Sequence, residues 1–493
     1  MTRSLISFDT DQIKRYVFAT DTLKEIRGAS RLLDALNQQD MKRLVGGTCH
    51  FAFGGSGLFT VDTADVDQAI ERVQKAYRDR TGGAATITGV AVELPEGFDE
   101  QTDNIQTVWR QLGYRLQAAK GRNGTYHTQV THPLLRPAHG DERFYAVDKD
   151  EEDNPISLVA QYKRETAKRT EGGPEDFDQI AAASIPSNYF ALVVADGDGL
   201  GQALNSCETL PQLRNAAGDI YKALDSVIQQ AVQEARLSPN QYDVLLLGGD
   251  DLVVALPAHH AIDFALRVAE GFTQQAPRLS DQPLTLSTAI VWAHPKFPFG
   301  IWHNVAESAL KFAKQERARR LQQDSDNCGP LINFLVISSP NHLDFGRYYQ
   351  EILVTKETDK QHIIRTMRPY TIAALKNLIS YRRNGLRTIP RSKLEGLQRA
   401  VFQSSSQQAM LNALRILVHW RGQKTRDAMQ QCIYDFTQAE ERPLFPFIQG
   451  KTTPFVITCS DEKEPRGAEI TTHRTPVVDL VELWDFIPVE NAS

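Results

Sequence analysis

The chain has 493 residues, a formal net charge of −6 at pH 7, 41% hydrophobic residues and 24% charged residues. These values are typical of a globular protein with several domains, and the negative charge disfavours indiscriminate nucleic-acid binding by the whole molecule. The five cysteines are scattered and no apolar run has the length of a signal peptide or a membrane span, so we expect a cytoplasmic protein without disulfides, cysteine-bound zinc or membrane contact.

The first 123 residues predict four strands and three helices. Asp9-Thr10-Asp11 follows the first strand, and the turn of the predicted hairpin reads Gly54-Gly55-Ser56-Gly57. Alternating apolar residues indicate the strands, and apolar residues at helical spacing indicate the helices. The predicted elements are strand 5–8, helix 23–44, hairpin 49–59, helix 64–78, strand 86–94 and a helix that ends near residue 123.

A polar segment, residues 124–187, follows. It contains an acidic stretch at 148–153 and a break at Gly172-Gly173-Pro174. Such composition is typical of connecting segments, so we interpret it as a connector with little core of its own.

Residues 188–339 repeat the order of the first unit. The predicted elements are strand 189–195, helix 210–236, a hairpin over 242–256, helix 258–274, strand 284–292 and helix 304–321. Each unit therefore reads β-α-β-β-α-β with one further helix, which is the ferredoxin-like arrangement. The predicted fold class is α+β, with two ferredoxin-like domains in tandem that form a pseudo-dimer.

Two adjacent carboxylates stand at the turn of the second hairpin. Asp250 and Asp251 follow Gly248-Gly249, and Asp196 ends the strand expected beside this hairpin. Like charges at one place are stabilised by a hard cation, and Mg²⁺ or Mn²⁺ bound in this way is common in enzymes that act on nucleoside triphosphates. A plain surface turn would also favour Asp and Gly, but the strongly apolar flanking strands favour the metal site.

Other residues near these carboxylates are candidates for contacts to a nucleotide. Glycines between a strand and a helix let backbone N–H groups approach phosphate oxygens, and a lysine on the last helix could reach a triphosphate. An exposed helical lysine and a small packing serine are the competing interpretations for Lys314 and Ser287. The candidates are Gly197, Asp198, Gly199, Gly201, Gly248, Gly249, Ser287 and Lys314.

Residues 340–493 predict a mostly helical C-terminal domain. Within it, residues 361–400 contain nine Lys or Arg residues and one acidic residue. This stretch is either a solvated helical face or a surface for nucleic acid or a protein partner.

Taken together, the duplicated unit and the Gly-Gly-Asp-Asp hairpin resemble the large polymerase/cyclase subunit of type III CRISPR effector complexes. Residues 12–18, 23–30, 287–298 and 390–394 are also similar to segments of that family. The resemblance implies two palm domains that join ATP into cyclic oligoadenylate second messengers in antiviral signalling. It implies metal binding by Asp196, Asp250 and Asp251, with guide or target RNA and other complex subunits as partners.

The resemblance also implies a second nucleotide held by the first palm. Arg27, Ser30, Gly54 and Gly55 would belong to that pocket, while Ser56 and Gly57 would stand where the second hairpin has its carboxylates, so the first palm would not catalyse.

Two family features have no counterpart in the sequence. It has no His-Asp dipeptide of an HD nuclease, and residues 132–138 have no cysteine for the zinc site, which indicates a divergent or stand-alone member. The alternatives are a nucleotide cyclase of the GGDEF or class III type, and a scaffold subunit of an RNA-guided complex that senses nucleotides without turnover.

Overall fold

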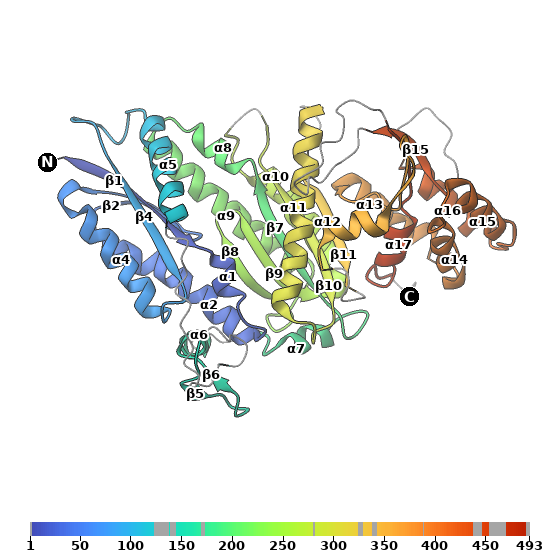
Figure 1. Cartoon of the computed structure of the whole chain (residues 1–493), viewed down its shortest axis with the longest axis horizontal. Helices are drawn as coiled ribbons and strands as arrows, with labels where there is room; N and C mark the ends of the chain where they lie inside the picture. The colour runs from blue at the N-terminus through green and yellow to red at the C-terminus, as the bar shows by residue number, and fades with distance from the viewer. Residues whose placement is uncertain are drawn as a thin grey trace.

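Two β-sheets with their helices form the body of the protein, and a third sheet with several helices lies beyond them (Figure 1). The fold is α+β, as predicted. The computed structural model describes residues 2–122, 138, 144–168, 173–279, 282–323, 329–337, 343–387, 389–436, 446–452 and 470–489. Residues 132–137 of the segment compared with the family's zinc site lie outside the described residues.

The first unit is a four-stranded antiparallel sheet with strand order β2-β3-β1-β4, which is the ferredoxin-like order. The predicted helix 23–44 is continuous through a π-helical turn, and the remaining predicted elements of this unit are present. The elements are β1 (Arg3–Asp11), α1 (Ile13–Val17), α2 (Leu23–Ala35), η1 (Leu36–Asp40), α3 (Met41–Val45), β2 (Thr48–Phe53), β3 (Ser56–Asp62), η2 (Thr63–Asp65), α4 (Val66–Arg80), β4 (Thr86–Glu93) and α5 (Gln106–Arg122).

The second unit has the same four-strand order, β8-β9-β7-β10, extended at β10 by β11 and β14. Strands β7 and β10 are almost fully buried, because helices and neighbouring elements cover both faces of the sheet. The elements are β7 (Phe190–Asp198), α8 (Leu200–Asn205), α9 (Leu210–Glu234), β8 (Asp243–Gly248), β9 (Asp251–Pro257), η3 (Ala258–His260), α10 (Ala261–Gln275), β10 (Thr285–Ala293), α11 (Phe299–Gln323) and β11 (Leu331–Val336).

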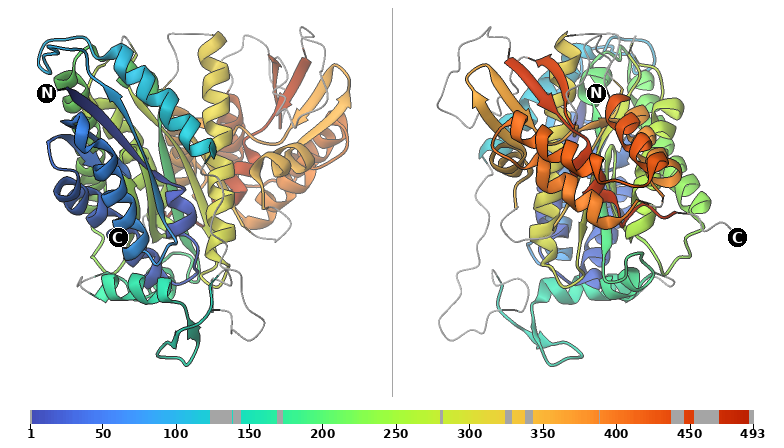
Figure 2. Two further views of the ribbon diagram at one scale, coloured as in Figure 1. Left: turned by 60° about the vertical axis from the view of Figure 1, so that its left-hand side comes forward. Right: turned by 90° about the vertical axis from the view of Figure 1, so that its right-hand side faces the viewer.

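The two units pack against each other reciprocally. Helix α2 of the first unit contacts β8 of the second, while α9 of the second unit, the counterpart of α2, contacts β2 of the first. The two hairpin turns meet at the centre: a Cβ on Gly54 would lie 2.4 Å from the backbone nitrogen of Gly249. One hydrophobic core continues through both units, which lie side by side in the left view of Figure 2, the first in blue and the second in green and yellow. This arrangement fixes the positions of the hairpins relative to each other.

The described part of the connector packs on both units. It consists of β5 (Asp148–Lys149), β6 (Pro155–Ile156), α6 (Leu158–Lys168) and α7 (Phe177–Ala182). Helix α6 contacts α2 of the first unit, and α7 contacts β7 and β9 of the second. Helix α6 lies close against α2, since a Cβ on Gly28 would come within 1.8 Å of the Lys163 carbonyl oxygen. Glycine at position 28 therefore permits the contact between the two helices.

The C-terminal part combines helices with a sheet that the sequence did not predict. Strand β13 pairs in parallel with β16, more than a hundred residues further along, and no local pattern indicates such a pairing. The elements are α12 (Phe345–Tyr348), η4 (Tyr349–Leu353), β12 (Val354–Thr358), β13 (Gln361–Ile364), β14 (Tyr370–Thr371), α13 (Ile372–Ser380), η5 (Tyr381–Gly385), α14 (Arg391–Val401), α15 (Ser406–Val418), α16 (Gln423–Tyr434), β15 (Ile448–Thr452), β16 (Ile470–Arg474) and α17 (Val477–Leu483). In the described part of the chain, every helix is too short or too polar to cross a bilayer.

A buried ion network joins this C-terminal part to the second sheet. Arg368 is fully buried and lies 3.0 Å from Asp479 and 2.8 Å from Glu482. Its guanidinium also donates a hydrogen bond of 2.9 Å to the carbonyl oxygen of Phe334 in β11. Since one buried cation serves partners in β11 and α17, the two parts are held together at this point.

Candidate active site

The structure brings the three predicted carboxylates together. Strands β7 and β9 are neighbours with Ala195 opposite Leu252, so Asp196 and Asp251 lie side by side at the same end of the sheet, and Asp250 is in the adjoining turn. Burial and the charges of Asp196 and Asp251 raise the pKa of Asp250 to about 7. Burial and the charge of Asp196 likewise raise the pKa of Asp251. The cluster is thus short of positive charge.

Two lysines from different units contact this cluster. Lys314 of α11 lies 2.7 Å from Asp196 Oδ2 and donates a hydrogen bond of 3.0 Å to the carbonyl oxygen of Gly197. Lys14 of α1 reaches across from the first unit and lies 3.0 Å from Asp251 Oδ1 and 3.0 Å from Glu307 Oε1. Burial lowers the pKa of Lys14, but the charges of Asp251 and Glu307 outweigh this effect and raise it.

Sequence reasoning had missed Lys14 and Glu307. Lys14 lies in the segment 12–18, which the sequence marks only through the family resemblance. Glu307 sits seven residues before Lys314 on α11, two helical turns away on the same face. This spacing could have identified it as a possible fourth carboxylate.

In this arrangement the carboxylates do not form a metal site. Among the described residues, no group of three or more His, Cys, Asp or Glu side chains is placed to hold a metal ion. The oxygen donors are of the type that Mg²⁺ and Mn²⁺ prefer, but Asp196 and Asp251 each contact a lysine instead. The residues present therefore do not fit a divalent cation unless the lysines move.

The first unit repeats part of the site at the level of individual contacts. Asp9 of β1 pairs with Lys120 of α5, as Asp196 of β7 pairs with Lys314 of α11. The strands β1 and β7 are equivalent, as are the helices α5 and α11. The duplication predicted from the sequence therefore extends to the ion pair at the end of the first strand of each unit.

A second pair of equivalent carboxylates lies two residues further along each strand. Asp198 accepts hydrogen bonds of 2.8 Å from Thr285 and 2.7 Å from Ser287, and Asp11 accepts bonds of 2.9 Å from Thr86 and Thr88. Ser287 and Asp198 are buried. Both were predicted to contact a nucleotide; the structure instead joins them to each other within the sheet, and a nucleotide contact stays a prediction.

The hairpin turns differ between the units. In the second hairpin Gly248 is opposite Asp251, and in the first Phe53 is opposite Ser56. The positions of Asp250 and Asp251 therefore correspond to Gly55 and Ser56. The alignment with Ser56 and Gly57 was wrong by one residue, because the two Gly-Gly pairs do not occupy the same turn positions.

Backbone conformation and local packing also disfavour a carboxylate at Gly55. This residue has a φ of +81°, and a Cβ there would lie 2.2 Å from Cδ1 of Ile13. Gly54 has a φ of +62° and takes the turn position of Gly249, which has a φ of +64°. In the first hairpin, Gly55 therefore occupies the position that corresponds to Asp250, and the turn packs closely against this glycine.

The glycines of the loop after β7 have distinct environments. A Cβ on Gly197 would lie 1.8 Å from Leu200 and 2.9 Å from Cβ of Asp250, so glycine leaves room for the hairpin carboxylate. Gly199 has a φ of +75° and precedes α8. Gly201 has nothing within 4 Å of its Cβ position. Phosphate contacts by these glycines and by Gly248 stay predictions.

Arg27 and Ser30, predicted in a nucleotide pocket of the first unit, are buried in α2. Arg27 donates a hydrogen bond of 2.7 Å to Asp243 of β8 and one of 2.6 Å to the carbonyl oxygen of Pro174. Arg27 therefore links the two units and the connector. Its role in nucleotide binding stays a prediction.

Two cavities of about 610 and 560 Å³ meet at Glu307. Lys14 and His303 line the larger one, and Asp196 and Lys314 line the other. His303 Nε2 is buried 3.5 Å from Glu307 Oε1 and has no hydrogen-bond partner among the residues that the structure describes. Both cavities border the carboxylate cluster along α11.

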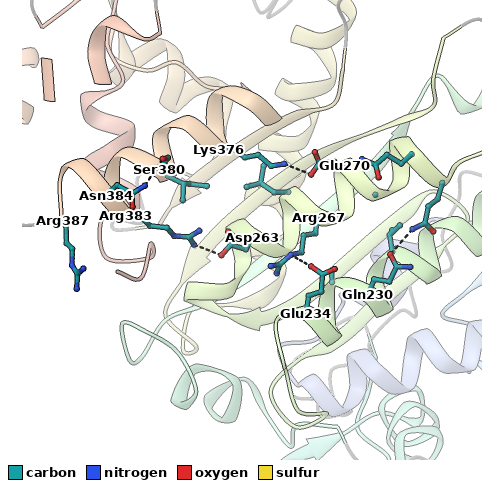
Figure 3. A pocket seen from close by; sticks show the side chains of 17 residues that line it. Gln230, Glu234, Asp263, Arg267, Glu270, Lys376, Ser380, Arg383, Asn384 and Arg387 are labelled. Atoms are coloured by element: carbon teal, nitrogen blue, oxygen red, sulfur yellow. Dashed lines mark hydrogen bonds and ion pairs between the residues drawn. The ribbon is translucent and has the colours of Figure 1, made fainter. Parts of the chain in front are cut away.

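A groove of about 950 Å³ lies elsewhere, between α9 and α10 on one side and α13 with η5 on the other (Figure 3). Ion pairs cross it from Lys376 to Glu270 at 2.6 Å and from Arg383 to Asp263 at 2.7 Å. This groove lies between the second unit and the C-terminal part, and Asp196, Asp250 and Asp251 are not among the residues that line it.

The basic stretch 361–400 is largely engaged within the chain. Lys376 and Arg383 pair across the groove, while Arg391 lies 3.2 Å from Asp485 and Arg382 stacks on Trp484. Arg365 donates hydrogen bonds to carbonyl oxygens of residues 401 and 403, and Lys393 to that of residue 419. These contacts favour a structural role for much of the stretch over an exposed nucleic-acid surface.

A ferredoxin-like sheet with adjacent carboxylates at a central hairpin turn defines the palm class of domains, which nucleotidyl polymerases and cyclases share. Residues 189–335 match the family described as Cas10/Cmr2, second palm domain. The chain thus contains a domain of the Cas10/Cmr2 second-palm family over these residues. No curated protein matches the sequence.

Solved structures agree with this fold. Csm1 in T. onnurineus is 14% identical with a TM-score of 0.53, and the match covers 85% of this chain and 64% of that one. An apo Csm1–Csm4 cassette is 14% identical, with a TM-score of 0.52 and coverage of 85% and 65%. A Csm1–Csm4 cassette in complex with cA4 is 13% identical, with a TM-score of 0.52 and coverage of 88% and 64%. The chain thus spans just under two thirds of the length of these three structures.

Proposed function

We propose that the protein is a nucleotidyltransferase that joins ATP into cyclic oligoadenylates and releases pyrophosphate, in CRISPR-type antiviral signalling. The observation that carries this proposal is the position of Asp250 and Asp251 beside Asp196 in the matched second palm domain. The solved cassette with cA4 supports the product class for this fold.

In the proposed reaction, the 3′-hydroxyl oxygen of one ATP attacks the α-phosphorus of another. The bond between that phosphorus and the bridging oxygen of the β-phosphate breaks, pyrophosphate leaves, and the proton of the hydroxyl passes to water. Asp196, Asp250 and Asp251 are the residues that would hold a Mg²⁺ or Mn²⁺ ion once Lys14 and Lys314 leave Asp251 and Asp196, and such an ion would neutralise charge on the phosphates. Lys314, at the same cluster, is suited to hold phosphate oxygens as a point charge.

The proposal includes a domain organisation. Residues 1–123 form a first palm domain that binds the second nucleotide without catalysing, 124–187 the connector, 188–339 the catalytic palm and 340–493 a C-terminal domain. The repeated strand order and the repeated aspartate–lysine pair support a tandem of palms. Association with RNA and with other effector subunits belongs to the same proposal.

The test is mass spectrometry of the products formed from purified protein, all four nucleoside triphosphates and Mg²⁺ or Mn²⁺. We expect a cyclic oligoadenylate from the natural protein and none from the Asp250→Ala/Asp251→Ala variant. The matched control is Asp62→Ala/Asp67→Ala, which removes two exposed carboxylates from the first unit. Undiminished product from the hairpin variant would contradict the proposal.

A second candidate is a subunit that senses nucleotides without turnover. Lysines contact Asp196 and Asp251, and among the described residues no group of three carboxylates is placed to bind a metal ion. This arrangement favours a subunit that binds nucleotides without turnover. Saturable ATP binding with no product, unchanged in the hairpin variant, would select this function over synthesis.

A further inference from the structure

Helix α15 presents an apolar stripe to solvent. Leu411, Leu414 and Val418 follow one another at spacings of three and four residues, so they lie on one face of the helix. Their exposed fractions are 62%, 40% and 79%. The buried residues of the same helix are mostly smaller: Ser406, Ala409, Ala413 and Leu417. Because a surface helix normally turns its larger apolar residues toward the core, this outward stripe indicates a contact with a partner.

The position of α15 leaves the stripe accessible. Helix α14 packs against both α15 and α17. A Cβ on Gly396 of α14 would lie 3.3 Å from Cδ1 of Ile416, so α14 and α15 approach closely on the side of Ile416. Helix α15 itself lies at the outer end of the C-terminal part, away from the two hairpins (Figure 1). A further helix can therefore pack on the stripe without displacing either unit.

The surroundings of the stripe are positively charged. Residues 396–426 contain five Lys or Arg residues and no Asp or Glu. Arg415 is next to the stripe on α15, and Arg421 and Lys424 come shortly after the helix ends. All three side chains are exposed, and none has an ion-pair partner among the residues that the structure describes. An apolar stripe flanked by unpaired cations is complementary to a partner that has an apolar stripe flanked by carboxylates.

Three other occupants fit this surface less well. A nucleic acid would pair its phosphates with the cations but leave the aliphatic stripe uncovered, because bases stack on aromatic and guanidinium groups. The net charge of −6 on the whole chain opposes binding to an anionic membrane. In a second copy of this chain, antiparallel pairing of two stripes centres near Leu414 and brings the two Arg415 side chains together, which like charges oppose.

We propose that the stripe of α15 is a docking site for an amphipathic α-helix of another protein, and that the polar flank of this helix is acidic. Its apolar side chains cover Leu411, Leu414 and Val418, and its carboxylates pair with the neighbouring arginines and lysine. The docking does not depend on turnover at the carboxylate cluster. Three side chains bury less area than a standard protein interface, so the helix alone binds weakly, with a dissociation constant of about 10 μM.

The test measures the binding of two fluorescently labelled synthetic peptides to the full chain by fluorescence anisotropy. Both peptides have about 18 residues, or about five helical turns, and the same leucine stripe. The polar flank carries Glu in the acidic peptide and Lys in the basic peptide. We expect the acidic peptide to bind at least about tenfold more tightly than the basic one.

Removal of the stripe tests its apolar contribution. Leu411→Gln/Val418→Gln should weaken binding of the acidic peptide about tenfold. The matched control, Tyr114→Gln/Ile352→Gln, removes two apolar side chains that are 75% and 38% exposed elsewhere, and should leave the affinity unchanged. The melting temperatures of both variants should equal that of the natural protein, because all four side chains are exposed.

Reversal of the charge tests the acidic character of the partner. In Arg415→Glu/Arg421→Glu the preference should invert, so that the basic peptide binds more tightly than the acidic one. Equal affinities of the natural protein for the two peptides, or no binding of either at about 100 μM, would overturn the proposal.

Three further measurements on the natural protein and Leu411→Gln/Val418→Gln address the other occupants. A dimer in sedimentation that the variant abolishes would assign the stripe to a second copy of the chain. Binding to phosphatidylserine vesicles that is lost in the variant would assign it to a membrane surface. Binding of single-stranded oligoadenylate RNA that is lost in the variant would assign it to nucleic acid. We expect none of these, and each of them would overturn the proposal.

Discussion

The first and second units share a strand order, an aspartate–lysine pair and a hydroxyl-bonded aspartate, yet only the second has carboxylates at its hairpin. The first hairpin has Gly55 and Ser56 at the equivalent positions, and Ile13 fills the space that a side chain at Gly55 would need. The comparison teaches that the scaffold of a site can persist while its reactive groups are lost. It also shows that the degenerate unit contributes to the other site through Lys14.

The second unit is joined to the C-terminal part by the buried contacts of Arg368. Arg368→Met should lower the free energy of unfolding by about 3–5 kcal/mol, because Asp479 and Glu482 would be left as unpaired charges against a fully buried site. Urea denaturation measures the change. Arg391→Met is the matched control: its ion pairs are exposed, and about 0–1 kcal/mol is expected. Similar losses for both variants would contradict the bracing role of Arg368.

Contact between the hairpins can be broken at Gly54. Gly54→Ala places a Cβ 2.4 Å from the backbone nitrogen of Gly249 at a φ of +62°, so we expect a loss of about 2–3 kcal/mol in unfolding free energy together with reduced product formation. Gly46→Ala has a similar φ of +70° but open space around its Cβ position, and should cost only about 1–2 kcal/mol. Thermal unfolding compares the two variants. Equal destabilisation would show that the close approach of the two turns does not constrain the residue at position 54.

Charge crowding at the second hairpin should appear as a pH dependence. Because burial and the neighbouring carboxylates raise the pKa of Asp250 from its ordinary value of 3.8 to about 7, its stabilising contribution is fully present below pH 3.8 and is lost as pH rises through about 7. Asp250→Asn should remove about 2–3 kcal/mol of this pH-dependent loss of unfolding free energy between pH 5 and 8. Denaturation at several pH values measures it. A curve for Asp250→Asn that parallels the natural protein would contradict the charge crowding.

The smallest expected difference concerns the hydroxyl-bonded aspartates. Ser287→Ala removes one hydrogen bond to the buried Asp198 and should cost about 1 kcal/mol, while Thr88→Val at the more exposed Asp11 should cost less. Chemical denaturation of both variants makes the comparison. A larger loss of unfolding free energy for Thr88→Val than for Ser287→Ala would contradict the expectation that the bond to the more buried aspartate contributes more.

The sequence predicted most of the architecture because both units rest on local patterns. Apolar periodicity located the strands and long helices, and the Gly-Gly-Asp-Asp turn located Asp250 and Asp251. The neighbouring position of Asp196 followed from the ferredoxin-like strand order.

What the sequence did not predict depends on contacts between distant segments. Lys14 and Glu307 join the site only through the docking of α1 and α11, which no local pattern records. The register of the first hairpin depends on the packing of Ile13 and Gly55, and the C-terminal sheet depends on the parallel pairing of β13 with β16. The burial of Ser287 and Arg27 likewise became visible only when their partners, Asp198 and Asp243, were placed.

The central claim is that catalysis belongs to the second hairpin alone. Asp251 and Ser56 occupy equivalent positions, so the most direct measurement is the amount of cyclic oligonucleotide that Asp251→Ala and Ser56→Ala form from ATP, by mass spectrometry. We predict a loss of about 100-fold or more for Asp251→Ala and a change of no more than about threefold for Ser56→Ala. Equal losses in the two variants, or full product from Asp251→Ala, would contradict the account.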